Sequence, residues 1–425
     1  MGRRAVRISA IAAATVLILA GSAVVVYRVL SPHEQLTRPT VAYPEPVIVT
    51  DERPFSELRA APLVIEGRLR VYAEKWRVWS DSPVGERYES TPYWAFRRWP
   101  AQVVGVVAAQ APTGPTVITQ WSDGQVIALD ARRGAVAWRT EAPANGRLYD
   151  GRRTGASVVY QPRSLLTARS AAGPVVIVTS PGLVVAYDAT SGEPLWRHTG
   201  TSDCEPDGWT GHGVVVLPDC AGTTLNLVQA ADGTELATWT APAGTAARPE
   251  LCELGRAECR LATDGVGHWA LNANGSLAPV PAPPPGAHLA GEALVYPIPG
   301  GVSAARISDG QPVWSWTGQG RLVAADAAGV YLLAEDGTVL GLSARTGHLA
   351  SVGCANGPED RPWKIGHTYP ATGNYLALER ITGEAPTVDD QRYFYGPRPI
   401  ALVELYAPTK LPVWPGKFAS CRRPV

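Results

Sequence analysis

The sequence of 425 residues predicts an all-β fold, and three observations support this prediction. One strand–turn–strand pattern recurs along the chain. Turn-forming residues are frequent, with 43 glycines and 38 prolines. No long apolar stripe with helical periodicity follows the N-terminal segment. The two clearest copies of the pattern read GQVIALDARRGAVAWR at residues 124–139 and GLVVAYDATSGEPLWR at residues 182–197.

The recurring pattern predicts a ring of similar blades. The two clear copies align without a gap, which matches four positions of one with four of the other: Ala128, Asp130, Gly134 and Trp138 with Ala186, Asp188, Gly192 and Trp196. Weaker copies follow, with turn glycines at Gly233, Gly275, Gly310 and Gly347, and with Trp314 after the third of these. A repeat of roughly 40 residues with strand-like content is typical of a β-propeller or a solenoid.

Each copy is interpreted as the outer hairpin of a four-stranded blade. An apolar run leads into a short polar turn that ends in glycine, and an alternating strand follows. Glycine suits this position because a left-handed backbone costs it little. Runs such as PTVITQW and GPVVIVTS, upstream of the two clear copies, supply the preceding strands. The tryptophan after the glycine buries roughly 150 to 250 Å² and wedges one sheet against the next.

The number of blades depends on the residues before the first clear copy. Counting from about residue 101 predicts seven blades, with the strands at residues 63–80 joining the last blade and closing the ring. If residues 63–100 form a blade of their own, the number is eight. Either arrangement removes the exposed edges of an open sheet.

The motif Ala-x-Asp-x-x-x-Gly-x-x-x-Trp, at Ala128 to Trp138 and Ala186 to Trp196, resembles the tryptophan-docking motif of the PQQ-like (quinoprotein-type) β-propeller repeat family. The resemblance spans roughly residues 100–415 and ends in a degenerate copy, LYAPTKLPVW at residues 405–414, with Lys410 in place of the glycine. It implies that the alanine and the tryptophan of neighbouring blades pack together in a girdle around the disc.

The N-terminus predicts export and membrane attachment. Arg3, Arg4 and Arg7 precede an uncharged run from Ile8 to Val26, which is long enough to cross about 30 Å of hydrocarbon as a helix. Positive charge before the span holds that end in the cytoplasm. The rival interpretation is a signal peptide cleaved near Gly21. We expect a membrane-spanning signal anchor in residues 1–30, a proline-rich stalk over residues 31–60 and an extracytoplasmic propeller over residues 61–425, as in a bacterial cell-envelope protein.

The cysteines agree with an exported chain. All six lie beyond the apolar span, and in a non-cytoplasmic segment they are interpreted as disulfides. Six cysteines allow 15 pairings. Proximity in the sequence favours Cys204 with Cys220 and Cys252 with Cys259, which leaves Cys354 for Cys421. The spacings do not match a zinc site.

The sequence does not predict a catalytic centre. It lacks the nucleophile-elbow, zincin and P-loop motifs. The quinone-dependent enzymes that the repeat resembles carry adjacent cysteines, and this chain has none. Asp130 and Asp188 are interpreted as turn-capping residues. We therefore expect no catalytic, cofactor-binding or metal-binding residues, and we favour a protein that is not an enzyme. Balanced charge, 38 basic against 38 acidic residues, gives no reason to expect a nucleic acid partner.

Two irregular segments interrupt the repeat, RYESTPYWAFRRWP at residues 87–100 and PTVDDQRYFYGPRP at residues 386–399. Their aromatic residues and arginines are of the types enriched in binding hot spots. The candidate partner surface comprises Trp94, Phe96, Trp99, Arg392, Tyr393, Phe394 and Tyr395. The competing interpretation is that these aromatic residues pack under a loop or across the ring closure.

The sequence thus predicts a non-catalytic docking or assembly platform, tethered to the cell membrane and bound to an envelope protein. The alternative is an exported propeller, either a sensor or an enzyme, that binds a small molecule in its central channel. Ligand-dependent thermal stabilisation would distinguish this alternative from the platform.

Overall fold

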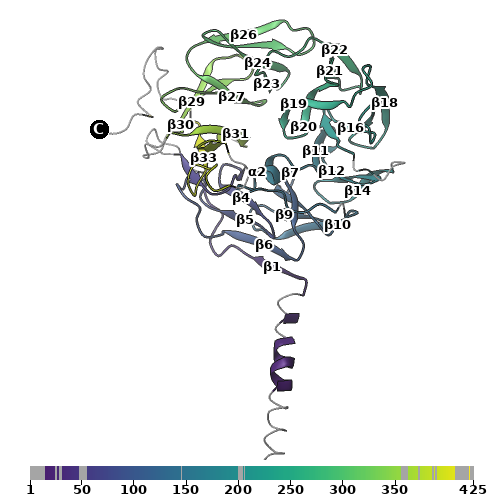
Figure 1. Cartoon of the computed structure of the whole chain (residues 1–425), viewed down its shortest axis with the longest axis vertical. Helices are drawn as coiled ribbons and strands as arrows, with labels where there is room; N and C mark the ends of the chain where they lie inside the picture. Colours follow the sequence, from purple (N-terminus) through teal and green to yellow (C-terminus); the bar gives the residue numbers. More distant parts are fainter. Residues whose placement is uncertain are drawn as a thin grey trace, which may run out of the picture.

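The strands form eight antiparallel sheets arranged as blades around an axis (Figure 1). The computed structural model describes residues 15–23, 26–27, 31–46, 55–144, 146–199, 204, 206–355, 362–371, 374–384, 387, 390–406 and 421. Seven sheets have four strands and one has five. The expected all-β propeller is confirmed, but seven was the wrong number of blades and the alternative of eight is correct, because residues 63–99 form a blade of their own.

In blades 2 to 7 the strands lie progressively outward from the axis in chain order, and the strands of blade 1 from residue 63 onward do the same (Figure 1). Blade 1 contains β3 (Leu63–Ile65), β4 (Leu69–Glu74), β5 (Arg77–Asp81), β6 (Trp94–Trp99) and β1 (His33–Thr37). Blades 2 and 3 contain β7 (Val103–Ala111), β8 (Gly114–Trp121), β9 (Gln125–Asp130), β10 (Val136–Glu141), β11 (Leu165–Ser170), β12 (Gly173–Ser180), β13 (Leu183–Asp188) and β14 (Pro194–Thr199).

The remaining blades follow the same order. Blades 4 and 5 contain β15 (Trp209–Gly211), β16 (Val214–Pro218), β17 (Thr224–Gln229), β18 (Glu235–Thr240), β19 (Arg248–Leu254), β20 (Ala257–Thr263), β21 (His268–Leu271) and β22 (Leu277–Val280). Blades 6 and 7 contain β23 (His288–Ala290), β24 (Ala293–Ile298), β25 (Gly301–Arg306), β26 (Pro312–Thr317), β27 (Arg321–Ala325), β28 (Gly329–Leu333), β29 (Thr338–Ser343) and β30 (Leu349–Cys354).

Blade 8 closes the ring with strands from both ends of the chain. Its inner strands are β31 (Lys364–Ala371), β32 (Tyr375–Ile381) and β33 (Ile400–Glu404), and its outermost strand is β2 (Ser56–Leu58). Glu57 pairs with Ala401 in this sheet. The prediction that residues 63–80 close the ring was wrong, because those residues begin blade 1. The closing strand is too short to show an alternating pattern in the sequence.

The described part of residues 31–60 is not a free stalk, which corrects the sequence-based prediction. β1 pairs antiparallel with β6 from His33 opposite Trp99 to Thr37 opposite Ala95. Glu34 also reaches across to Arg139 of blade 2, at 2.8 Å between carboxylate and guanidinium. The prolines described in this range, Pro32, Pro39, Pro44 and Pro46, lie outside the two strands. The segment therefore adds an outer edge to blade 1 and the last strand to blade 8.

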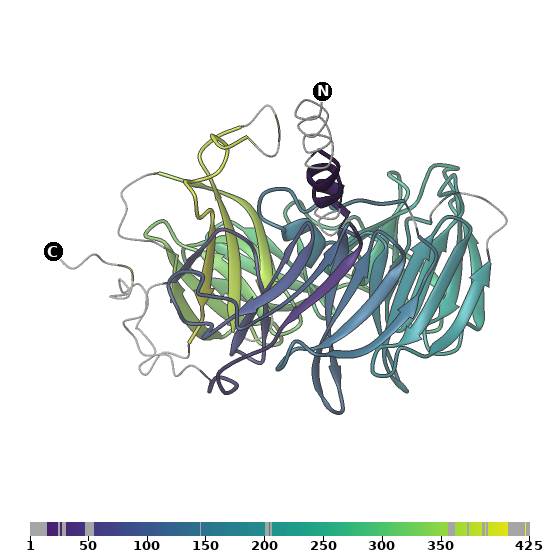
Figure 2. The same ribbon diagram turned by 90° about the horizontal axis from the view of Figure 1, so that it is seen from below.

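Residues 15–23 are helical and exposed, and Figure 2 shows this helix projecting from one face of the ring. Its apolar side chains are largely exposed, with Leu17 at 72% and Ile18 at 68%. Within the ranges that the structure describes, no helix has both the length and the apolar character to cross a membrane. Much of the predicted anchor, including Arg3, Arg4 and Arg7, lies outside the described residues.

Four tryptophans dock one blade onto the next. Each indole nitrogen donates a hydrogen bond to a carbonyl oxygen of the following blade at 2.7 to 3.1 Å: Trp94 to Ala131, Trp138 to Ala189, Trp196 to Ala230 and Trp314 to Ala344. Each indole also covers a turn glycine. These glycines are Gly134, Gly192, Gly233 and Gly347, and a Cβ atom added to any of them would lie 2.4 to 2.7 Å from the indole ring. The glycines are thus required by close approach as well as by their left-handed backbones.

The repeat alanines and aspartates support this arrangement within each blade. Ala128 and Ala186 are fully buried and pair across the sheet with Trp138 and Trp196. Asp188 accepts hydrogen bonds from the backbone nitrogens of Thr190 and Ser191. Partial burial opposes ionisation of Asp188, but these hydrogen bonds outweigh it and lower the pKa of its carboxyl. The Asp188 carboxylate therefore orders the turn that receives Trp138.

The docking is not uniform around the ring. Between blades 4 and 5, Leu236 lies against Gly275 where a tryptophan would otherwise dock. Between blades 5 and 6, no atom of the described residues beyond Gly310 and its two chain neighbours lies within 4 Å of the position of a Cβ at Gly310. The expectation of one aromatic wedge per blade is therefore too simple. Residues 407–414, which include most of the degenerate last copy, lie outside the described residues.

The central channel is occupied by parts of the chain. Helix α2 (Ala156–Tyr160) buries four of its five side chains, and Figure 1 shows it near the middle of the ring. The Tyr160 ring stacks on Tyr369 of β31 with centroids 4.6 Å apart. From the opposite side the tip of the β19–β20 hairpin reaches the helix, since a Cβ at Gly255 would lie 2.6 Å from the Tyr160 carbonyl oxygen. Arg256, next to Gly255 in the chain, donates a hydrogen bond to the Asp207 carboxylate.

All three predicted disulfides are present, which confirms the pairing by proximity. Cys204 bonds Cys220, and Cys354 bonds Cys421. The third, between Cys252 and Cys259, joins directly opposed residues of the hairpin that enters the channel. It therefore braces the segment that fills the axis.

Candidate functional site

The two irregular segments that the sequence singled out lie side by side where blade 8 meets blade 1. The first segment, residues 87–100, comprises the second half of the β5–β6 connection (residues 82–93) and strand β6. The second, residues 386–399, belongs to the β32–β33 connection, of which the structure describes residues 382–384, 387 and 390–399. The Arg398 guanidinium lies 4.5 Å above the Tyr88 ring, and its Nε is 3.6 Å from the Glu89 carboxylate. We call the surface at this junction the closure surface and define it by Arg87, Tyr88, Arg153, Arg392 and Arg398, of which Tyr88 and Arg392 are exposed and the other three are partly buried.

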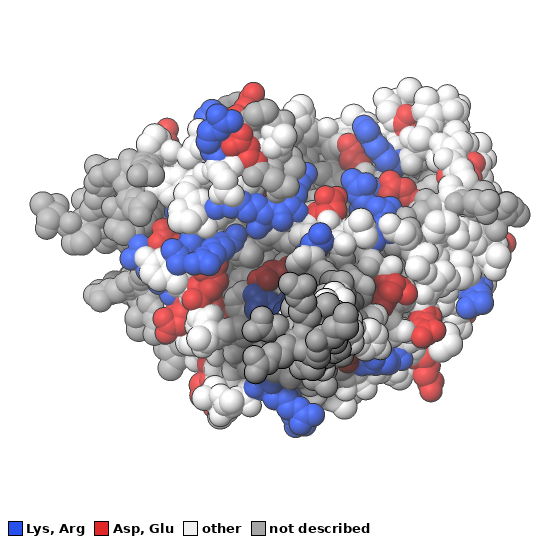
Figure 3. Space-filling view, turned by 60° about the horizontal axis from the view of Figure 1, so that its bottom comes forward, with Lys and Arg blue, Asp and Glu red and all other residues white. Residues whose placement is uncertain are grey.

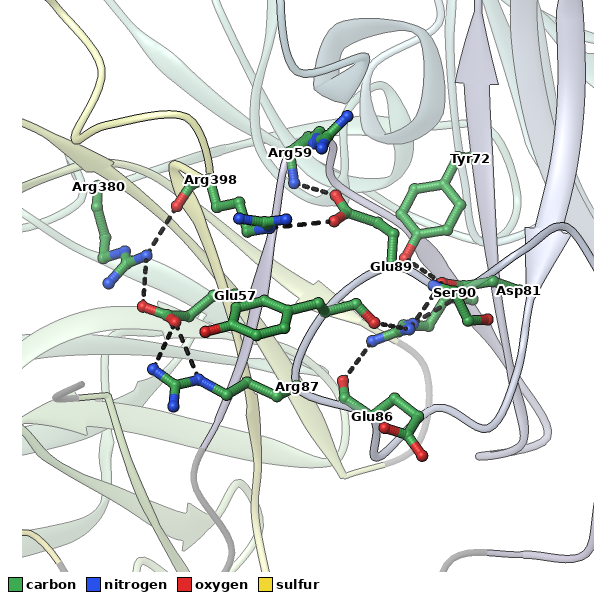
Figure 4. Close-up of polar contacts among 12 residues, drawn as sticks. Glu57, Arg59, Tyr72, Asp81, Glu86, Arg87, Glu89, Ser90, Arg380 and Arg398 are labelled. Carbon is green, nitrogen blue, oxygen red and sulfur yellow. Dashed lines mark hydrogen bonds and ion pairs between the residues drawn. The ribbon is translucent and has the colours of Figure 1, made fainter. Parts of the chain in front are cut away.

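A buried ion pair fixes the β5–β6 connection. Arg70 and Asp81 have fully buried side chains and form two hydrogen bonds, from Nε to Oδ1 at 2.8 Å and from Nη2 to Oδ2 at 2.7 Å. Arg70 also donates to the carbonyls of Glu86 and Tyr88 (Figure 4). Burial raises the pKa of the Asp81 carboxyl, and the hydrogen bonds from Arg70 oppose this rise. The pair positions the backbone that presents Tyr88.

Glu57 on the closing strand links the two blades. Arg87 and Arg380 approach its carboxylate from two sides, at 2.9 and 3.5 Å (Figure 4). Arg380 is only 2% exposed and donates to the Arg398 carbonyl at 2.7 Å. Its guanidinium lies over the rings of Phe55 and Tyr395. Because a buried charge is stable only when it is well paired, this arrangement holds the β32–β33 connection firmly against blade 1.

The connection between blades 2 and 3 also contributes to the closure surface, through Arg153. The Arg153 guanidinium lies 4.7 Å from the centre of the Phe394 ring and donates to the Gly396 carbonyl at 3.0 Å. Burial lowers the pKa of Arg153. Arginines on aromatic rings thus recur along the whole junction. Such contacts contribute about 0.5 to 2 kcal/mol each, depending on solvent exposure.

The predicted partner-surface residues divide into two groups. Trp94, Phe96, Phe394 and Tyr395 are buried, so they are part of the core and the competing interpretation is correct for them. Trp99 and Tyr393 are partly buried, whereas the Arg392 side chain is 84% exposed.

The role of Trp94 in particular differs from the prediction. It is the docking tryptophan of blade 1, and its place in the repeat was hidden because a long connection replaces the short glycine turn before it. Exposed Tyr88 and partly buried Arg398 were within the two segments, but their neighbourhood depends on pairing between distant strands.

The closure surface carries a small excess of positive charge, because three of its four arginines lie beside a carboxylate. Its four arginines are accompanied nearby by Glu57 and Glu89, both largely buried, and by Asp390, which pairs with Arg392. Exposed Arg59 and Arg152 lie at its edge. Figure 3 shows Lys and Arg side chains forming a band over part of one face of the ring, with Asp and Glu interspersed. Among the described residues there is no cluster of three or more His, Cys, Asp or Glu side chains that could hold a metal ion.

These features define the class of the protein: an eight-bladed β-propeller with tryptophan-docked blades, a filled axis and a basic, aromatic surface at the ring closure. A family model described as "Outer membrane protein assembly factor BamB" matches residues 48–236. This match covers less than half of the chain and, together with the repeat geometry, supports its similarity to the PQQ-like β-propellers.

Similarity to solved structures concerns the fold alone. The chain is similar to BamB from Moraxella catarrhalis, at 15% identity and a TM-score of 0.40, over 88% of this chain and 100% of that one. It is also similar to the computationally designed protein Ika8, at 14% identity and a TM-score of 0.44, over 83% and 99% of the two chains. A quinohemoprotein alcohol dehydrogenase of Pseudomonas putida HK5 aligns at 13% identity and a TM-score of 0.39, over 90% and 78%. A search of curated protein sequences finds no match.

Proposed function

We propose that the protein is a non-catalytic docking platform of the bacterial cell envelope, tethered to the cell membrane by its N-terminal segment and bound to an envelope protein through the closure surface. The observation that carries the proposal is the arrangement at this surface. Charged and aromatic groups are held in place by buried pairs, so binding a partner would require little ordering of side chains.

The orientation of the surface supports a partner at the membrane. Figure 2 shows the β32–β33 connection and the N-terminal helix projecting from the same face of the ring. The apolar run from Ile8 to Val26, preceded by three arginines, supports a tether with its N-terminus in the cytoplasm. Three disulfides support an extracytoplasmic location for the ring.

The filled axis also favours the platform over a ligand site in the central channel. Helix α2 and the β19–β20 hairpin meet across the axis, and a small molecule would have to displace both. The matching family model carries the name of an assembly factor, which supports a role in protein docking.

Partner capture from native membranes tests the proposal. The full-length protein is cross-linked in membranes of its host and purified, alongside the double variant Tyr88→Ala, Arg392→Gln. Both side chains are exposed, so the fold should be retained. The matched control is Arg345→Gln, which removes an exposed arginine from the turn after β29.

We expect one envelope protein to co-purify with the wild type and the control, and roughly tenfold less of it with the double variant, a loss of about 1.4 kcal/mol. Equal recovery from all three would show that the closure surface is not the docking site. Absence of any specific partner from the wild type would contradict the platform itself.

Membrane fractionation tests the tether separately. We expect the full chain to stay in the membrane pellet after alkaline extraction, and the ring to be digested by protease added to the outside of intact spheroplasts. Release by alkali would contradict an integral anchor, and protection from the protease would contradict the proposed side of the membrane.

A further inference from the structure

A second polar site lies between blades 5 and 6, on a different part of the ring from the closure surface. It is a cavity of about 180 Å³ whose polar lining consists of His212, Arg260, Asn272, Glu292, Arg306 and Ser308. Ala270 and Ile307 add an apolar wall, and both are buried. These residues come from three blades, so the cavity exists only in the assembled ring.

Arg260 is the central group of this cavity. Its side chain, on β20, is only 11% exposed. Nη2 lies 3.1 Å from a Glu292 carboxylate oxygen, and Nη1 lies 3.6 Å from Glu258, too far for a hydrogen bond. Among the residues that the structure describes, no acceptor bonds Nε or Nη1, although both atoms are buried. Buried donors without acceptors are costly and uncommon in proteins, so these atoms point to a missing acceptor.

The surroundings restrict the charge of that acceptor. Glu292 is 71% exposed and lies 3.7 Å from His212 as well as beside Arg260. Burial, and then the charge of Arg260, lower the pKa of His212, which therefore adds no positive charge at neutral pH. Arg306 is paired with Asp309 at 2.8 Å. Two nearby glutamates oppose a strongly charged anion such as phosphate, whereas a singly charged carboxylate fits one incompletely paired guanidinium.

The size and the apolar wall restrict the rest of the ligand. One water occupies about 30 Å³ of liquid, so the cavity has room for only a few heavy atoms beyond a carboxylate. Ala270 and Ile307 would contact a methyl or short alkyl group. We propose that this pocket binds a carboxylate carrying a small apolar group, with Arg260 as the anchor. The inference does not depend on the docking function proposed above.

Such a carboxylate has two sources, a free small acid and the C-terminus of a polypeptide. Titration calorimetry of the full-length protein in detergent with N-acetylalanine tests the shared chemistry. N-acetylalanine amide is the matched probe without the charge. The acetylated tripeptide Gly-Gly-Ala with a free carboxylate distinguishes the sources, because tighter binding than N-acetylalanine indicates a chain terminus and weaker binding indicates a free acid.

We expect N-acetylalanine to bind and its amide to bind at least tenfold more weakly. Arg260→Gln should weaken binding of the acid at least tenfold, and the control Arg345→Gln should leave it unchanged. Glu292→Gln removes the competing carboxylate from Arg260, so it should strengthen binding severalfold. A purely structural ion pair would not produce this opposite effect.

The proposal is overturned if the wild type does not bind N-acetylalanine, or if Arg260→Gln binds it as well as the wild type does. If Arg260→Gln fails to fold, as judged by its melting curve, Glu292→Gln decides, since this exposed residue is dispensable for the core. Unchanged or weaker binding by Glu292→Gln would contradict Arg260 as the anchor.

Discussion

Replacing Trp196 with alanine should lower the free energy of unfolding by about 3 to 5 kcal/mol, the usual cost of truncating a buried tryptophan. The side chain is 9% exposed, covers Gly233 and donates to the Ala230 carbonyl at 2.8 Å. The hydrogen bond accounts for about 1 kcal/mol of this loss, and lost packing between blades 3 and 4 accounts for the rest. Trp196→Phe should therefore cost less than Trp196→Ala.

The turn glycine provides a second test of the same contact. A Cβ at Gly233 would lie 2.7 Å from the Trp196 ring, and the backbone there has a φ of 77°. Gly310 has a similar φ of 68°, but in the described part of the chain only its own neighbours in sequence lie within 4 Å of its Cβ position. Gly310→Ala thus measures the backbone cost alone, about 1 to 2 kcal/mol. Gly233→Ala should cost more, because the indole must also move.

The assay is urea unfolding of the full chain in detergent, followed by circular dichroism. In the double variant Trp196→Ala, Gly233→Ala the steric conflict is absent. The two losses should therefore combine to less than their sum, with a coupling of about 0.5 to 3 kcal/mol. Additive losses, or equal costs for Gly233→Ala and Gly310→Ala, would refute tryptophan docking as the interaction between these blades.

Three further predictions concern the hairpin in the channel and the turn carboxylates. Replacing both Cys252 and Cys259 with serine should lower the free energy of unfolding by about 2 kcal/mol, because their disulfide closes a short loop with a sequence separation of 7. Thermal melting under non-reducing conditions measures this loss, and an unchanged melting temperature would contradict it. Gly255→Ala should loosen the hairpin from helix α2 and increase hydrogen exchange at both, whereas exchange confined to the hairpin would argue against their contact. Folding lowers the pKa of Asp188, so the ionised carboxylate stabilises the fold above its ordinary pKa of 3.8, and this contribution is lost as the pH falls through the lowered value. Asp188→Asn should therefore reduce the loss of stability between pH 6 and pH 3. An identical loss in the variant and the wild type would contradict this.

The sequence predicted the blades wherever short turns preserve the repeat. Gly134 and Gly192, with the tryptophans four residues after them, were recognisable because each hairpin is compact. Blade 1 was ambiguous because a connection of 12 residues, 82–93, separates β5 from β6 and displaces Trp94 from its expected spacing. The closing strand, only 3 residues long, carries no periodic signal.

The candidate site was predicted as two segments and not as one surface. Aromatic and arginine content drew attention to both, but composition does not separate buried rings such as Phe96 from exposed ones such as Tyr88. That distinction depends on the ring closure, which brings together residues more than 300 positions apart in the sequence, such as Glu57 and Arg380. The Arg260 pocket gave no signal, because its residues are scattered over three blades.

Site-specific photo-cross-linking in native membranes tests the central claim most directly. A photoreactive phenylalanine analogue replaces Tyr88 in one variant and Arg345 in another. The proposed docking function predicts one discrete cross-linked envelope protein from position 88 and none from position 345. The same products from both positions, or a product from position 345 alone, would contradict docking through the closure surface.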